Sequence, residues 1–112
     1  MPTLLPRDSE NNIIPAVRLK DSAAHSINAT TSSARNATAF ATDTRIISLY
    51  ATVPVRLKFG DASVTASASD HYFPAGVYYD VSIGGGKVGH YPYLAILREG
   101  SSDGVVYISE KE

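Results

Sequence analysis

Short runs of β-branched and aromatic residues, separated by turn signals roughly every ten residues, constrain the fold of this chain most strongly. In the clearest run, residues 55–59, apolar side chains alternate with Arg56 and Lys58. This is the period-two pattern of a strand with one face in water. No segment has the apolar spacing of three and four residues that marks an amphipathic helix. The sequence therefore predicts an all-β fold, a single β-sandwich or jelly-roll-like domain.

Proline and glycine indicate where the predicted strands end. Residues 45–53 predict a well-buried strand, and Pro54 then marks an edge, a bulge or the point where the chain changes sheets. Strands are also predicted at 93–98 and 105–109. The loop between them is rich in glycine, serine and acidic residues, a composition that closes hairpins. We therefore expect these last two strands to pair with each other.

A further strand is predicted at residues 77–83, directly after a turn. Residues 73–76 have proline and glycine at the second and fourth positions, where a type I turn favours them. The alternation in the strand indicates which side chains face the core. They are Val77, Tyr79, Val81 and Ile83.

The N-terminal part has weaker patterns. Residues 1–15 carry three prolines around a polar stretch, which predicts an extended arm, and residues 16–112 form the single domain. Between residues 22 and 44 the chain consists mostly of alanine, serine and threonine, with only Ile27 and Phe40 as large apolar residues. This composition favours short weak strands or a loop on the surface.

Composition excludes several classes of function. Ten basic and eleven acidic side chains give a net charge of -1, so the chain offers no electrostatic attraction to nucleic acid or to an anionic membrane. There is no cysteine, which rules out disulfides and thiolate metal sites. No signal peptide and no apolar stretch long enough for a membrane span is recognisable. We expect a soluble protein made in the cytoplasm.

No motif for catalysis, metal or cofactor binding stands out. The run 84–87, Gly-Gly-Gly-Lys, lacks the spacing and following helix of a phosphate-binding loop and is interpreted as a turn. Asp70, His71 and Asp80 lack a nucleophile motif that would make them part of a triad. The histidines lack the paired spacing of metal ligands and are interpreted as scattered turn residues. They are His25, His71 and His90.

Tyrosine is the residue type that most suggests binding. The chain has seven tyrosines, and rings near turns tend to be exposed. Exposed tyrosines serve at protein interfaces and can stack on sugars, although such rings can also simply cap a small core. The candidate interface or ligand-stacking residues are Tyr72, Tyr78, Tyr91 and Tyr93.

Residues 44–79 resemble a family of small proteins encoded by tailed bacteriophages and prophages. The matching pattern is a strand that ends in Phe59-Gly60, an Ala/Thr-rich segment, and then Asp70 followed by the run Phe-Pro-Ala-Gly-Val-Tyr-Tyr at 73–79. The closing strands at 94–97 and 104–110 are similar as well. The chain departs from the pattern at Pro54 and in its longer N-terminal half, which leaves its position in the particle open.

The resemblance implies a virion protein, and the preferred hypothesis is a capsid decoration (cement) protein that binds the major capsid protein. Tail, collar or neck accessory proteins are the alternatives within this setting. A homo-oligomer is expected, with a trimer favoured, because a small core gains stability when copies bury apolar surface against each other. The arm would contact the capsid through apolar side chains. These are Leu4, Leu5, Ile13 and Ile14.

A hypothesis from a different class is a carbohydrate-binding β-sandwich that uses the exposed tyrosine rings. It can coexist with the first, because a decoration protein can present a sugar-binding face to a host. An enzyme is the least favoured interpretation, since the sequence names no nucleophile and no substrate.

Overall fold

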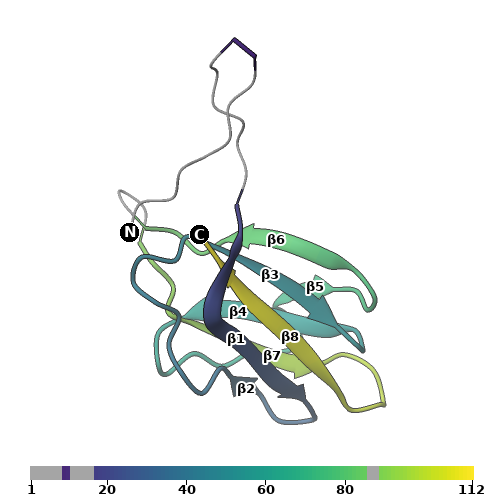
Figure 1. Ribbon diagram of the computed structural model, residues 1–112. Helices are drawn as coiled ribbons and strands as arrows, with labels where there is room; N and C mark the ends of the chain where they lie inside the picture. Colours follow the sequence, from purple (N-terminus) through teal and green to yellow (C-terminus); the bar gives the residue numbers. More distant parts are fainter. Residues whose placement is uncertain (1–8, 11–16, 86–88) are drawn as a thin grey trace.

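A computed structural model describes residues 9–10, 17–85 and 89–112 of the chain (Figure 1). These residues form eight β-strands and no helix, which confirms the all-β prediction. Most of the predicted arm lies outside the described residues, and so do Leu4, Leu5, Ile13 and Ile14. In chain order the strands are β1 (Leu19–Ala29), β2 (Ala34–Arg35), β3 (Ile46–Ala51), β4 (Val55–Gly60), β5 (His71–Phe73), β6 (Tyr78–Ser82), β7 (Tyr93–Arg98) and β8 (Gly104–Lys111).

The strands pair like one long ribbon folded back on itself. β1 pairs with β8, β2 with β7, β3 with β6 and β4 with β5, always antiparallel. Ladders between β3 and β8 and between β4 and β7 join these pairs into two sheets, of order β1-β8-β3-β6 and β2-β7-β4-β5. This nested pairing is the strand order of a jelly roll. The β-sandwich prediction is therefore confirmed, and the order of the strands specifies its type.

The chain changes sheets at almost every connection. β3 lies in the first sheet and β4 in the second, so Pro54 marks a change of sheet, one of its three expected roles. The predicted hairpin of β7 and β8 is wrong, because residues 99–103, which connect them, also cross between sheets. β7 pairs with β2 and β4, whereas β8 pairs with β1 and β3. Glycine, serine and aspartate turn the chain equally well in a hairpin or in a crossing, so composition does not separate the two.

Apolar side chains from the inner faces of the two sheets form one core. Ile47 and Leu49 of β3 and Leu94 and Ile96 of β7 are completely buried. Each such side chain stabilises the fold by about 1.5–3 kcal/mol relative to an exposed one. The core continues toward the ends of the sandwich through Ile27, Phe40, Val55, Leu57, Phe73, Ile83, Val106 and Ile108.

Segment 22–44 is more regular than expected. β1 is an eleven-residue strand rather than a short weak one, because β8 offers it a long partner. Its register shifts between Leu19 and Ala24, where Ser22 has a φ of 58°. Ile27 and Phe40, the two large apolar residues of the segment, are both buried.

β6 departs from its predicted alternation. Ile83 is buried and Val81 is half-buried, as predicted, but Val77 and Tyr79 are exposed. β6 is the edge strand of its sheet, and β5, at the same edge of the other sheet, is only three residues long. Because β5 is so short, it does not cover the first half of β6.

The turn before β6 also differs from the prediction. Gly76 has a φ of 78°, as the third position of a type II turn requires. The turn therefore begins at Pro74, one residue later than expected, and it is not of type I.

One of the two outer faces is partly covered by the chain itself. The connection between β4 and β5 spans residues 61–70, and the Ala66 backbone N–H donates to Ser33 Oγ at 2.8 Å, beside β2. Because β7 separates β4 from β2, the connection crosses β7, whose outward residue Ala95 is completely buried. The outer face of the second sheet is thus partly covered, and the first sheet offers the more open surface.

Candidate functional site: a row of tyrosines on the open sheet

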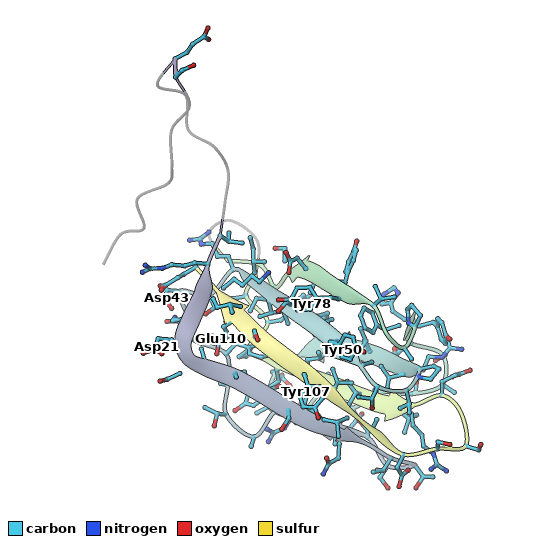
Figure 2. The ribbon with its side chains drawn as sticks, turned by 45° about the vertical axis from the view of Figure 1, so that its right-hand side comes forward. Asp21, Asp43, Tyr50, Tyr78, Tyr107 and Glu110 are labelled. Carbon is cyan, nitrogen blue, oxygen red and sulfur yellow. The ribbon has the colours of Figure 1, made fainter. Side chains whose placement is uncertain are left out.

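Three tyrosines lie side by side across the outer face of the first sheet. Tyr50, on the central strand β3, is in register with Tyr78 on β6 and with Tyr107 on β8. Leu49, Ala51 and Val106, the sequence neighbours of Tyr50 and Tyr107, are buried, so these two rings point away from the core. Tyr78 lies on the same face because it pairs with Tyr50. Figure 2 shows them in a line across the sheet. We call the surface formed by Tyr50, Tyr78 and Tyr107 the tyrosine face.

These rings are exposed to a similar degree. Tyr50 is 38% exposed, Tyr107 52% and Tyr78 59%. On β1, the next strand of the sheet, the residue in register with Tyr107 is Ser26, so the aromatic row ends there. Large aromatic side chains that stay half exposed in a row on the outer face of a sheet are suited to stacking against a ligand or a partner surface.

Polar side chains border the tyrosine face on one side. In the neighbouring row Asp80 pairs with Ser48, and Ser48 pairs with Ser109. Lys111 reaches across from β8, and its Nζ lies 2.8 Å from Asp80 Oδ1 and 5.1 Å from the centre of the Tyr78 ring. Ser48 is 2% exposed although it faces outward, which fits the passage of the lysine chain over it.

The charges on this surface compensate each other. The hydrogen bond to Asp80 raises the pKa of Lys111 above its ordinary value, although burial acts against it. The lysine therefore stays protonated at neutral pH and forms an ion pair with the aspartate. Around the tyrosine face the outward residues of β1 are Ala24, Ser26 and Asn28, which carry no charge.

The four tyrosines singled out from the sequence do not form one site. Tyr78 belongs to the tyrosine face, whereas Tyr72 lies on β5 with Arg56 5.2 Å from its ring centre. Tyr91 stacks on Phe59, with ring centres 5.9 Å apart. Tyr93 is half-buried, and Arg35 lies 4.3 Å from its ring centre.

Sequence reasoning missed Tyr50 and Tyr107. Both lie inside predicted strands, whereas the candidates were chosen among tyrosines near turns. The period-two alternation does put each of these tyrosines on the face opposite to that of its apolar neighbours, so each strand by itself indicates that the ring faces outward. Their alignment with Tyr78 depends on which strands pair, and no local pattern specifies that pairing.

A second exposed feature lies where the arm enters the domain. The backbones of Arg18 and Glu112 exchange two hydrogen bonds of 2.9 Å, and their side chains form an ion pair at 3.2 Å. On either side of Arg18, Val17 is 45% and Leu19 62% exposed. We call Val17 and Leu19 the arm root. It combines a fixed backbone with uncovered apolar side chains.

Among the described residues, the histidines do not gather into a metal site. No group of three histidine, aspartate or glutamate side chains is arranged to hold an ion in this part of the chain. His25 is not a turn residue as expected, since it lies in β1 and its Nε2 is 2.7 Å from Glu110 Oε2. His90 Nε2 contacts the Thr44 carbonyl at 3.1 Å, and His71 is exposed at the start of β5.

The carboxylates considered for a hydrolytic triad have other partners. Asp70 accepts hydrogen bonds from the backbone and side chain of Ser67, and these bonds hold the pKa of its carboxyl below the ordinary value against the effect of burial. Asp80 binds Lys111 instead of a histidine. Both side chains therefore have structural roles at the surface.

No protein-family model, curated protein or solved structure matches this chain. The described residues contain no helix that could cross a membrane. By its fold and surfaces, the protein is an all-β sandwich with an open tyrosine face and an apolar arm root.

Proposed function

We propose that this protein is a structural component of a tailed-bacteriophage particle, where it decorates and stabilises the capsid as a cement protein without enzymatic activity. One observation carries the proposal. At the arm root, Val17 and Leu19 are exposed while the backbone of Arg18 between them is fixed to Glu112. A partner that covers these side chains gains apolar contact without having to order the backbone that presents them.

The resemblance to phage virion proteins supports the same proposal. Its most specific residues, 70–79, form β5, the turn at Gly76 and the start of β6, which together link the two sheets. Jelly rolls also recur among viral capsid domains. That is an analogy at the level of the fold, so it supports the setting and does not assign the role.

Two contacts would act together in attachment. The arm, residues 1–15, would lie on the major capsid protein or on a neighbouring copy, and the arm root would pack beside it. Linking two weak contacts raises the overall affinity because the second contact forms within the complex. A homotrimer would add to this by presenting three arms to the shell.

Co-sedimentation with empty capsids of the phage that carries the gene tests the proposal. The double variant Val17→Asp, Leu19→Asp should pellet with an affinity reduced roughly tenfold, since burial of one leucine is worth a factor of this size. Deletion of residues 2–15 should also weaken pelleting and leave the domain folded. The matched control is Val77→Asp, which places the same charge at another exposed valine (41% exposed) and should pellet like the wild type.

Attachment that stays unchanged both in the arm-root variant and in the arm deletion would contradict the proposal. Light scattering gives the oligomeric state in the same samples. A mass three times that of the 11.9 kDa chain is expected. A monomer that does not pellet with capsids would favour a tail or neck accessory protein instead.

A further inference from the structure

We infer that the tyrosine face binds an uncharged saccharide chain, which lies across β6, β3 and β8 along the row of rings. The inference does not rest on the capsid role, because it concerns a different surface from the arm root. It uses three observations, which are the alignment of the rings, the charge of the surface and the size of its apolar area.

The alignment provides a continuous track. Neighbouring strands lie about 4.8 Å apart, so the outer two rings of the row are separated by roughly 10 Å. That span suits consecutive sugar units of one chain, whose apolar C–H faces can stack on successive rings. Ser26 and Ser109 lie at the edge of the row, where their hydroxyl groups can hydrogen-bond to sugar hydroxyls.

The charge of the surface fits a neutral ligand. Asp80 and Lys111 neutralise each other at 2.8 Å, and the outward residues of β1 that lie nearest the rings, Ala24, Ser26 and Asn28, carry no charge. A polyanion would find no uncompensated cation beside the rings, and a polycation no uncompensated carboxylate. The same ion pair still offers donors and acceptors that a hydroxyl-rich ligand can use.

The size of the surface argues against a protein partner or a second copy. Three tyrosines that are each about half exposed present on the order of 300 Å² of side-chain surface. A stable protein interface buries about 800 Å² on each partner. The outward residues beside the rings are mostly small or polar, namely Ala24, Ser26, Asn28, Ser48 and Ser109. Val105, the larger apolar residue on this face of β8, is only partly exposed and adds little apolar surface. A narrow ligand fits this surface better than a protein does.

Affinity electrophoresis of the purified full chain tests the inference. Native gels would contain hydroxyethylcellulose, dextran, laminarin or galactomannan, with alginate as the charged comparison. We expect at least one neutral polysaccharide to retard the wild type. Tyr50→Ala removes the central ring and should weaken the retardation roughly tenfold, whereas Tyr50→Phe keeps a ring and should retain most of it.

Tyr72→Ala is the matched control, because Tyr72 is as exposed as Tyr107 but lies on the other sheet. It should bind like the wild type. The chain has no tryptophan, so tyrosine fluorescence gives a second readout with the soluble polysaccharide that retards the protein. Three outcomes would overturn the inference. They are unchanged mobility in every neutral gel, retardation by alginate alone, or wild-type binding by a folded Tyr50→Ala variant.

Discussion

The Nε2 atom of His25 lies 2.7 Å from the Oε2 atom of Glu110, which joins the first strand to the last near one end of the sandwich. The other carboxylate oxygen accepts the Thr44 hydroxyl at 2.5 Å and the Ala41 backbone N–H at 2.9 Å. Glu110 is 4% exposed. Figure 2 shows it on β8. One buried carboxylate thus connects β1, β8 and the segment before β3.

The stability of the protein should depend on pH through Glu110. Burial raises the pKa of this carboxyl, but hydrogen bonds from Thr44, His25 and the Ala41 backbone outweigh it and hold the pKa below its ordinary value of 4.5. The unfolded chain therefore binds this proton more readily than the folded protein. The stabilisation is present above pH 4.5 and is lost as the pH falls through the lowered pKa.

Urea unfolding of the wild type and of Glu110→Gln between pH 3 and pH 6 would measure this contribution. At pH 6 the variant should be less stable by about 1–3 kcal/mol, since it replaces charge-assisted hydrogen bonds with neutral ones. The difference should shrink toward pH 3. The exposed carboxylates are the same in both proteins, so their contributions to the pH dependence of stability cancel in the difference. A difference that stays constant over this range would contradict the assignment.

Asn36→Ala should destabilise the fold by roughly 2–3 kcal/mol, because the Asn36 side chain is fully buried and satisfies several backbone groups. Its Oδ1 accepts the Leu94 N–H at 2.9 Å, and its Nδ2 donates to the carbonyls of Thr38 and Pro92. Asn28→Ala, at an exposed position, should change stability by less than about 0.5 kcal/mol. Thermal unfolding of both variants compares them, and equal effects would be inconsistent with this role.

Gly104→Ala should destabilise the protein by about 1–3 kcal/mol through overpacking. A methyl group at this position would lie 2.6 Å from Thr52 Oγ1 and 2.6 Å from a Val53 methyl group, closer than such atoms approach. Gly100, in the connection just before β8, has open space around it, so Gly100→Ala should be neutral or slightly stabilising. Chemical denaturation gives both values. Similar stability of the two variants would contradict overpacking at Gly104, because it would mean that the backbone there shifts to admit the methyl group without a loss of stability.

Removal of tyrosine rings from the open sheet should cost little stability. Tyr50→Ala and Tyr107→Ala each lose exposed cross-strand contacts, which are worth about 0.2–1 kcal/mol per pair. The matched core variant Leu49→Ala, one residue from Tyr50 on the buried face, should cost about 2–5 kcal/mol. Differential scanning calorimetry on the three proteins tests this contrast. A large loss in the tyrosine variants would show that the rings are structural.

Several local features could be predicted from the sequence because they depend on neighbouring residues. The alternation at 55–59 predicted β4, with Val55 and Leu57 buried and Lys58 exposed. Pro54 has no backbone N–H to donate to a neighbouring strand, so it interrupts the hydrogen-bond ladder whichever sheet the chain enters next. The same reasoning failed for Val77 and Tyr79, whose burial depends on the length of the opposite strand rather than on their own pattern.

The tyrosine face could be predicted only in part. Tyr78 was singled out because it follows a turn, whereas Tyr50 and Tyr107 lie inside strands rich in apolar residues. Each strand specifies which side of it a tyrosine occupies. Which strands become neighbours, and in which register, depends on contacts between segments that are far apart in the sequence. Tyr50 and Tyr107, for example, are separated by about half the chain.

The sequence by itself determined the class of the fold and the positions of most strands, because period-two alternation and turn residues act over a few positions. Only the tertiary structure decided that β7 and β8 lie in different sheets, that residues 61–70 cover part of one outer face, and that three tyrosines align on the other. These features follow from the nested strand pairing, in which β1 pairs with β8, β2 with β7, β3 with β6 and β4 with β5. That pairing is selected by how well both sheets bury their apolar faces at once, a property of the whole chain and not of any single segment.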